Sequence, residues 1–259
     1  MNARVGLAEL TAAVAAAVAL GALVVAGVGC ANAPSTLVIL QNQLVTPDMT
    51  TGTCTPTEDL DSALLSGTFD VDLDKDYPYI LHPLLESRLP SLQTADGIER
   101  NSLTLTALHI EIQAPAGVSP DWPAGCPATF DAPAPLVIDP QQTRVLTVNG
   151  LQPCHSQHLR QLIKDGAIPA SSAQPVYFTL AIQAIATHAG STLESDVFPF
   201  PVAVCAGCLQ AHFPATPMCI DTPKPNPDPG NTCNVAQDGP QVLCCVDPAG
   251  ALVCPAPDI

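Results

Sequence analysis

The chain has 259 residues, with 8 lysines and arginines against 24 aspartates and glutamates, and its formal net charge is −16 at pH 7. A protein this acidic repels phosphate backbones and anionic lipid headgroups, so the charge argues strongly against nucleic acid as a partner and against membrane attachment by a basic surface. Its eleven cysteines predict disulfides if the chain reaches an oxidising compartment.

The N-terminus carries the pattern of an export signal over residues 1–29. Arg4 comes first, an apolar stretch of alanine, leucine and valine follows, and small residues stand directly before Cys30. A positive start, an apolar centre and a small-residue cleavage site are the three parts of a secretory signal. We therefore expect residues 1–29 to be removed and Cys30 to begin the mature protein.

Two other interpretations of this segment remain open. An uncleaved anchor needs roughly 20 apolar residues, and the run from Leu10 to Gly29 has about that length, although alanine, glycine and valine dominate it. Ordinary cleavage after Ala31 would instead release the protein without a lipid. The three interpretations differ in the fate of Cys30, which is acylated, retained in an anchor, or lost.

A cysteine that follows small residues resembles the lipobox of bacterial lipoproteins, in which the thiol is acylated and the cysteine becomes the first residue. Gly29 and Cys30 fit this motif, whereas Gly27 stands where leucine or valine is usual. The resemblance implies a lipid on Cys30, so that acyl chains attach the protein to the membrane. Ala31 in place of aspartate implies the outer membrane, by similarity to enteric lipoproteins. As a whole the chain resembles uncharacterised cysteine-rich lipoproteins of the cell envelope.

Ten cysteines remain when Cys30 is set aside, and an even number fits complete pairing in disulfides. Three of them lie before residue 205 and seven lie from residue 205 onward. Because both numbers are odd, complete pairing requires at least one bridge between the two groups. The cysteines predicted to pair are Cys54, Cys126, Cys154, Cys205, Cys208, Cys219, Cys233, Cys244, Cys245 and Cys254.

From residue 36 to residue 204 the sequence predicts strands. Apolar and polar residues alternate with a period of two, which is typical of strands with one buried and one solvated face. Pro199 and Pro201 predict an edge or bulged position for the last strand. The strands and turn-rich connections favour a mainly β fold, an antiparallel β-sandwich of immunoglobulin-like architecture with one or two short helices. The main predicted strands are Leu37–Leu40, Thr68–Asp74, Leu103–Gln113, Val145–Val148, Val176–Ala184 and Val197–Val204.

One helix interrupts this pattern between Ser156 and Gly166. Ser156 is the expected N-cap, apolar residues follow at helical spacing, and Gly166 stands where a C-terminal cap is expected. The segment Tyr79–Leu92 is ambiguous, because its leucines fit a helical turn while Pro83 and Pro90 limit a helix to about two turns. The sequence thus predicts one helix and leaves a second open.

Residues 30–35 form a short tether, and residues 205–259 form an extension of a different character. Apolar alternation stops at Cys205, and the segment Thr222–Gly230 has proline at every second position, which favours an extended strut. The last stretch, Thr232–Ile259, is too short for a hydrophobic core of its own and would depend on cross-links. We therefore expect a disulfide-rich and proline-rich extension that is linked to the sandwich by at least one disulfide.

Cys205 and Cys208 have the spacing of a thiol-redox pair or of half a zinc knuckle. The redox interpretation needs the first thiol at a helix N-terminus, and Pro214 and Pro217 leave space for barely two turns. The zinc interpretation needs a second pair of the same spacing, whereas the tail offers two adjacent cysteines. A structural disulfide is therefore the expected state of the pair.

Two further groups contain residue types that bind metal ions. The aspartate run Asp70–Asp76 lacks the glycine and glutamate of a calcium loop. We therefore expect these carboxylates on the solvated face of a strand. The alternative is a weak Ca²⁺ site formed by Asp72, Asp74 and Asp76. His155 and His158 bracket the start of the predicted helix, but no carboxylate follows at the next turn. A polar cap is the expected role of these histidines.

These observations predict a non-enzymatic lipoprotein of the cell envelope. The sequence contains no nucleophile elbow, zinc-protease motif, phosphate-binding glycine loop or dinucleotide fingerprint. We expect no catalytic residue, no metal site and no cofactor, and as partners the membrane through the lipid on Cys30 and an envelope protein. One alternative is an extracytoplasmic binding module for a small ligand or metal ion, with an exposed aromatic such as Trp122. The other is a thiol-redox enzyme that uses Cys205 and Cys208.

Overall fold

The computed structural model describes residues 35–48, 50–73, 76–92, 96–171 and 173–211. After residue 211 it describes 233, 234, 236–239, 242, 243, 245, 246, 249, 252 and 253. The export signal, Cys30 and the proline-rich segment Thr222–Gly230 therefore lie outside the described residues.

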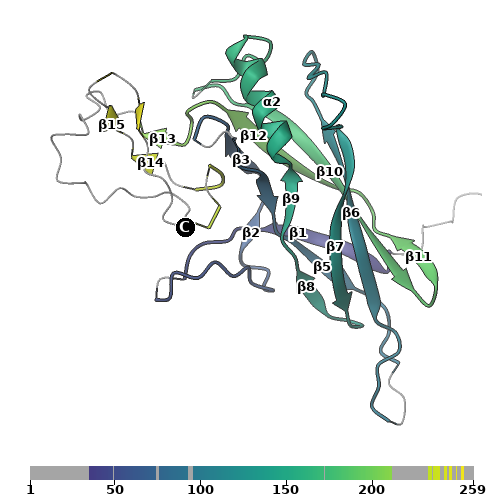
Figure 1. The fold of residues 1–259 in the computed structure, drawn as a ribbon. Helices are drawn as coiled ribbons and strands as arrows, with labels where there is room; N and C mark the ends of the chain where they lie inside the picture. Colours follow the sequence, from purple (N-terminus) through teal and green to yellow (C-terminus); the bar gives the residue numbers. More distant parts are fainter. Residues whose placement is uncertain are drawn as a thin grey trace, which may run out of the picture. The chain divides into compact units, whose positions relative to one another are not determined.

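The described chain is mainly β, with one α-helix among the described residues (Figure 1). Its long strands are rich in β-branched and aromatic residues, which pack well on a pleated and half-buried surface. The elements are β1 (Leu37–Gln43), β2 (Ala63–Leu64), β3 (Gly67–Asp70), β4 (Tyr79–Leu81), β5 (Pro83–Ser87), β6 (Leu103–Gln113), β7 (Thr129–Ile138), β8 (Thr143–Val145), β9 (Val148–Leu151), α2 (Pro153–Lys164), β10 (Val176–His188), β11 (Ser191–Glu194), β12 (Phe198–Cys205), β13 (Gln210–Ala211), β14 (Val242–Leu243), β15 (Cys245–Val246) and β16 (Leu252–Val253).

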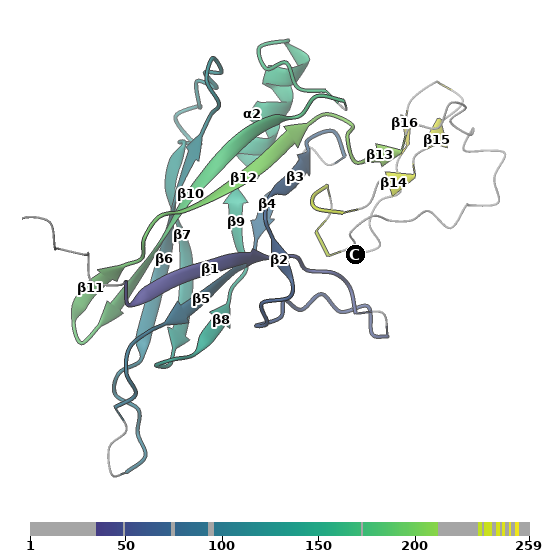
Figure 2. The same ribbon diagram turned by 180° about the vertical axis from the view of Figure 1, so that it is seen from behind.

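Two main sheets organise these strands. The larger sheet has the order β3-β12-β10-β6-β7, with β11 also paired to β10, and the smaller sheet has the order β2-β1-β5-β8. A separate antiparallel pair joins β4 to β9. In Figure 2, β1 lies across the strands of the larger sheet. The predicted class, mainly β with antiparallel sheets, is confirmed, while the immunoglobulin-like architecture stays a prediction.

The hydrophobic core lies between the two sheets. In the second half of β6 the alternation is regular, because Ile110 and Ile112 are buried while Glu111 and Gln113 are exposed. Buried apolar residues of β6 and β10 form a single hydrophobic cluster with Leu37 and Ile39 of β1 and Leu85 of β5. Complete burial of one aliphatic side chain stabilises a fold by roughly 1.5–3 kcal/mol, so this shared cluster holds the two sheets together.

The strand β12 has different neighbours along its length. Its second half, Val202–Cys205, pairs in parallel with Gly67–Asp70 of β3. The half that contains Pro199 and Pro201 pairs with β10 alone among the described strands. Because proline has no N–H to donate to a second neighbour, this half has the edge character that the sequence predicted.

The helix α2 begins at Pro153, and its N-cap is Gln152, so the prediction of Ser156 as N-cap is wrong. Proline is well suited to the first helical position, where its missing N–H would have no helical acceptor. Ser156 lies one turn into the helix, and its hydroxyl donates to the carbonyl oxygen of Tyr77 at 2.7 Å. Gly166 follows the helix with a φ of 73°, in agreement with its predicted C-terminal role.

The segment Tyr79–Leu92 contains strands, so the helix considered there is wrong. Tyr79–Leu81 forms β4 and Pro83–Ser87 forms β5. Leu84 and Leu85 are both fully buried although they point to opposite faces of β5. A strand that is buried on both faces carries consecutive apolar residues, and this pattern matched a helical turn equally well.

Candidate functional site

Three disulfides connect cysteines of the described residues. They are Cys54–Cys233, Cys126–Cys154 and Cys205–Cys208. The first bridge spans 179 positions and joins the sandwich to the region after residue 205, which is the kind of link that the odd numbers of cysteines in the two groups demand. Cys219, Cys244 and Cys254 lie outside the described residues, as does the side chain of Cys245.

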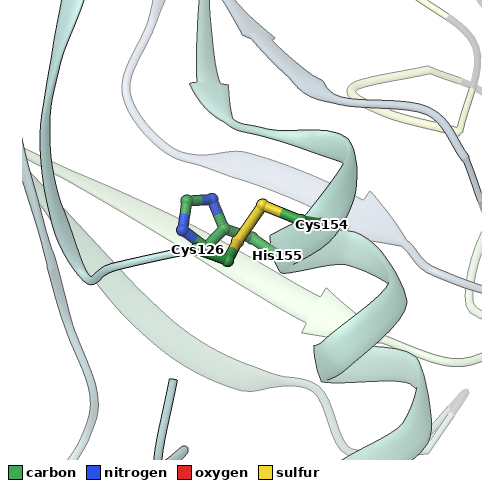
Figure 3. Close-up of side chains that lie close together, drawn as sticks. All are labelled: Cys126, Cys154 and His155. Atoms are coloured by element: carbon green, nitrogen blue, oxygen red, sulfur yellow. A yellow bond between two sulfur atoms is a disulfide. The ribbon is translucent and has the colours of Figure 1, made fainter. Parts of the chain in front are cut away.

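His155 lies beside the Cys126–Cys154 bridge in the first turn of α2 (Figure 3). Its imidazole Nδ1 accepts the main-chain N–H of Gln152 at 3.0 Å, and Nε2 lies 3.0 Å from the carbonyl oxygen of Pro127. A ring that accepts at one nitrogen and donates at the other is neutral, and burial lowers the pKa of His155. Because both ring nitrogens are hydrogen-bonded, His155 caps the N-terminus of the helix and has no nitrogen available to bind a metal ion.

Aromatic rings surround His155. Trp122 packs edge-on against it with 5.0 Å between ring centroids, and Phe130 of β7 packs at 5.3 Å. His158 lies one turn further along the helix, 5.5 Å from Trp122, and bonds the carbonyl oxygen of Pro120. Trp122 is thus half-buried and packs against both histidines. The binding-module alternative had predicted an exposed aromatic at this position.

A pocket of about 380 Å³ lies between β7 and β9, next to these rings. Phe130 gives it an aromatic wall, and Asp131, Thr147, Asn149 and Gln152 add carboxylate, hydroxyl and amide groups. Among the described strands, β7 pairs only with β6 and β9 pairs only with β4, so the pocket lies between two strand edges. An aromatic surface with a few polar groups is typical of sites for small ligands.

Asp70 is the last residue of β3 and is fully buried, so the predicted solvated position of this carboxylate is wrong. The alternation was broken because the strand ends here and a turn follows. The carboxylate accepts hydrogen bonds from the main-chain N–H groups of Asp72 at 3.0 Å, Gly207 at 2.8 Å and Leu209 at 3.0 Å. Burial raises the pKa of Asp70 in spite of these donors.

The Cys205–Cys208 bridge lies beside this carboxylate. A carboxylate oxygen of Asp70 and both sulfur atoms lie within 4.8 Å of one another. Cys205 is fully buried, whereas Cys208 is partly exposed. Ala206 and Gly207 between the two cysteines form bends, and Cys208 and Leu209 form a turn, so the redox pair does not have the helix N-terminus that the sequence interpretation required.

Two clusters bring three metal-ligand atoms together among the described residues. One contains the Cys126–Cys154 bridge with His155, and the other contains the Cys205–Cys208 bridge with Asp70. In both clusters the sulfur atoms are joined to each other. A sulfur in a disulfide has no thiolate to offer a metal ion, so these clusters are not metal sites in the oxidised protein.

The later aspartates of the run bind side chains of α2. Asp72 forms an ion pair with Arg160 at 2.9 Å. Asp76 accepts a hydrogen bond from the amide group of Gln157 at 2.9 Å, and Asp74 lies outside the described residues. These two contacts connect the helix to the link between β3 and β4.

In the described segment that follows Cys233, residues 236–238 extend the larger sheet beyond β3. The main-chain N–H of Asp70 donates to the carbonyl oxygen of Ala236 at 2.9 Å, and the N–H of Asp238 donates to that of Thr68 at 3.0 Å. These bonds occupy the edge of β3 that would otherwise be open to another chain. The described part of the C-terminal extension is therefore paired to the sandwich as well as disulfide-bonded to it.

Two side chains of this segment complete the contact. The amide group of Gln237 accepts the N–H of Ile80 at 2.6 Å and donates to the Ile80 carbonyl oxygen at 2.8 Å, as a neighbouring strand would. The imidazole Nε2 of His82 lies 3.2 Å from Nδ2 and 3.4 Å from Oδ1 of Asn234. Burial lowers the pKa of His82, so this contact is formed by the neutral ring.

Asp238 places its carboxylate beside Tyr79. One oxygen accepts the Tyr79 hydroxyl at 2.8 Å, and the other accepts the N–H of Thr68 at 2.6 Å. Burial raises the pKa of Asp238 to about 6, and it also raises the pKa of Tyr79 above its ordinary value. Gly67 makes room for this pair, because a Cβ there would overlap the Tyr79 hydroxyl.

Cys54 and Cys233 were predicted to form disulfides, but the hydrogen-bonding side chains that anchor the C-terminal segment were not predicted as contacts. Tyr79 and Asp238 are separated by 159 positions, and neither lies in a recognisable motif. The one available signal was the odd number of cysteines on each side of residue 205. This parity indicated that a disulfide links the extension to the sandwich, but it did not indicate which residues of the two regions are in contact.

None of the helices that the structure describes is long and apolar enough to span a bilayer. No protein-family profile matches the chain, and no curated protein sequence matches it significantly. The function of the protein is therefore inferred from its own residues and their geometry.

Proposed function

We propose that the protein is a non-enzymatic, lipid-anchored protein of the cell envelope that presents a β-sandwich to a protein partner. The Cys54–Cys233 disulfide is the observation that supports this most. Such a bridge persists in an oxidising compartment and is rare in the cytoplasm. Acyl chains on Cys30 would supply the membrane attachment that an acidic surface cannot supply.

The buried titratable side chains around the C-terminal segment and the helix support a structural role. His155 bonds two main-chain groups, and Asp238 bonds Thr68 and Tyr79. His82 lies between Thr147 and Asn234. A catalytic acid or base has to reach a substrate, whereas these groups hold neighbouring segments of the protein in place. Binding of a partner requires no such group.

Detergent partitioning tests the proposed anchor. Wild-type protein made in a Gram-negative host is expected in the detergent phase, and the Cys30→Ser variant is expected as an uncleaved precursor or in the aqueous phase. Gln174→Ala is the control, since it changes an exposed side chain and leaves Cys30 and the described disulfides intact. Wild-type protein in the aqueous phase would contradict the proposal.

The pocket between β7 and β9 favours a second candidate function, binding of a small polar ligand outside the cytoplasm. Phe130 offers a face for an apolar ring surface, and Asn149 and Gln152 offer amide donors and acceptors. This combination suits a hydroxylated ring such as a sugar. Titration of labelled protein with a panel of monosaccharides would shift the amide signals of Asn149 and Gln152.

The matched variants for this titration are Asn149→Ala inside the pocket and Gln174→Ala outside it. Loss of the shifts in the first variant alone supports a site in the pocket. No shift at these signals with any sugar of the panel removes this candidate and leaves the anchored partner-binding role.

A further inference from the structure

We propose that the Cys205–Cys208 disulfide is a redox-exchangeable bridge that oxidises a dithiol. Cys208 is the sulfur that the dithiol attacks, and Asp70 is the group that gives its proton to Cys205 as the bridge opens. This exchange goes beyond the anchoring and binding role proposed above and does not depend on it, and because each protein oxidises one dithiol stoichiometrically it requires no enzymatic turnover.

The bridge contributes little as a cross-link. Its cysteines are separated by 3 positions, against 28 for Cys126–Cys154 and 179 for Cys54–Cys233. A disulfide stabilises a protein mainly by restricting the unfolded chain, and this effect grows with the length of the closed loop. Stabilisation of the fold therefore explains this bridge less well than it explains the other two.

The two cysteines of the bridge differ in their exposure to solvent. Cys208 is partly exposed, and Cys205 is fully buried at the end of β12. Exchange begins when a thiolate attacks one sulfur and the other sulfur leaves, so access selects Cys208 as the attacked atom. The sulfur of Cys205 lies 3.5 Å from the carbonyl oxygen of Phe69, which can accept the S–H that forms on reduction.

Hydrogen bonds hold the loop in place independently of the sulfur–sulfur bond. The N–H groups of Gly207 and Leu209 donate to the Asp70 carboxylate at 2.8 and 3.0 Å. The carbonyl oxygen of Cys205 accepts the N–H of Val71 at 3.0 Å. The two thiols therefore stay close together after the bridge opens, and the bridge can form again.

Asp70 has the position and the environment of a proton-transfer group. Its carboxylate lies within 4.8 Å of both sulfur atoms, and its burial favours the protonated form. The charged group that acts on it from the following turn is Asp72, which is paired with Arg160 of α2. A protonated Asp70 can donate to the departing thiolate, whereas an ionised Asp70 repels that thiolate.

The exchange proceeds in two steps. A thiolate of the dithiol attacks the sulfur of Cys208, a mixed disulfide forms, the Cys205–Cys208 bond breaks, and the thiolate of Cys205 takes the proton of Asp70. The second thiol of the reductant then loses its proton to water and attacks the sulfur of its own molecule in the mixed disulfide. The dithiol leaves as a cyclic disulfide, and Cys208 takes a proton from water. Two electrons pass from the dithiol to the protein.

Reduction of the purified protein by dithiothreitol between pH 5 and pH 8 tests the role of Asp70. Acid quenching, alkylation and peptide mass mapping give a separate rate for each bridge, which is divided by the concentration of dithiothreitol thiolate. For Cys205–Cys208 in the wild type, this corrected rate is expected to fall by about tenfold or more from pH 5 to pH 8. Asp70→Asn is expected to vary by less than about twofold, because an amide donates no proton.

Asp131→Asn is the matched control, since it removes a carboxylate that pairs with His109 of β6 and is not among the groups that act on Asp70, and it is expected to keep the wild-type pH profile. A corrected wild-type rate that does not change with pH overturns the proposal, and this result does not depend on the folding of any variant. An Asp70→Asn profile equal to that of the wild type overturns it as well.

A pair of single-cysteine variants tests which sulfur is attacked. In Cys205→Ser the thiol of Cys208 is expected to react with an aromatic disulfide about tenfold or more faster than the thiol of Cys205 reacts in Cys208→Ser. Circular dichroism checks that both variants are folded. Equal rates, or a faster Cys205, overturn the assignment.

Discussion

The hydroxyl group of Tyr79 donates a hydrogen bond of 2.8 Å to the carboxylate of Asp238, across 159 positions of sequence. The other carboxylate oxygen of Asp238 accepts the N–H of Thr68 at 2.6 Å. One residue of the C-terminal extension thus bonds both β3 and β4. Tyr79 itself is fully buried and packs edge-on against Phe69 at 5.7 Å, so this contact reaches into the core.

Tyr79→Phe is expected to destabilise the protein by about 1–3 kcal/mol, because the buried carboxylate of Asp238 loses a donor. The ring and its packing are retained. Tyr177→Phe is the matched control, since Tyr177 is 57% exposed, and we expect no measurable change there. Denaturant unfolding with the disulfides intact gives both values, and equal stability of the two variants would contradict the importance of the Tyr79–Asp238 contact.

Stability is expected to depend on pH through Asp238. Its pKa is about 6 in the folded protein against 3.8 for an ordinary aspartate, so the folded protein binds this proton more tightly. The contribution is therefore fully present below pH 3.8 and is lost as the pH rises through about 6, a change of about 3 kcal/mol.

The difference in unfolding free energy between the wild type and Asp238→Asn isolates this effect, because other titrating groups are common to both proteins. We expect the wild type to lose stability relative to the variant between pH 4 and pH 7. A difference that is constant over this range would show that Asp238 is not buried as described.

The loss of stability on removal of a disulfide is expected to increase with the length of the loop that the disulfide closes. Replacement of both Cys54 and Cys233 by serine should cost about 5 kcal/mol and replacement of Cys205 and Cys208 about 2 kcal/mol, since the sequence separations are 179 and 3. Calorimetric melting of the two double variants measures the order. A greater loss from the Cys205–Cys208 pair would mean that this bridge is a major structural cross-link.

Gly67→Ala is expected to destabilise the fold by about 1–3 kcal/mol or more, because the added Cβ overlaps the hydroxyl of Tyr79 and cannot be accommodated without moving β3 or β4. Gly125→Ala is the matched control, since a Cβ there meets no atom within 4 Å, and a change within about 0.5 kcal/mol is expected. Thermal unfolding of both variants makes the comparison, and similar melting temperatures would contradict the close packing of Gly67 on Tyr79.

The strands that could be predicted were those with one buried face. β6 has the predicted bounds Leu103–Gln113, since buried and more exposed residues alternate on each side of a register shift between Leu105 and Ala107. β7 was missed, since Pro133 and Pro135 lie within it and it is paired on one side only among the described strands. An edge strand tolerates prolines. Here the prolines interrupt the regular alternation of apolar and polar residues by which a strand is predicted from sequence.

The sites could be predicted only in part. The number of cysteines indicated a bridge between the sandwich and the extension, because parity is a property of composition. The burial of Asp70 and the contact of Asp238 with Tyr79 depend on which segments meet in three dimensions, and no local pattern records that. The capping role of Gln152 was missed because the more usual cap residue, Ser156, stands four positions later.

Intact mass spectrometry of the protein from envelope membranes tests the proposed anchor most directly. We predict a mature chain that begins at Cys30 and carries the additional mass of acyl groups. A mature chain that begins at Asn32 without acyl mass would contradict it and would establish ordinary secretion instead.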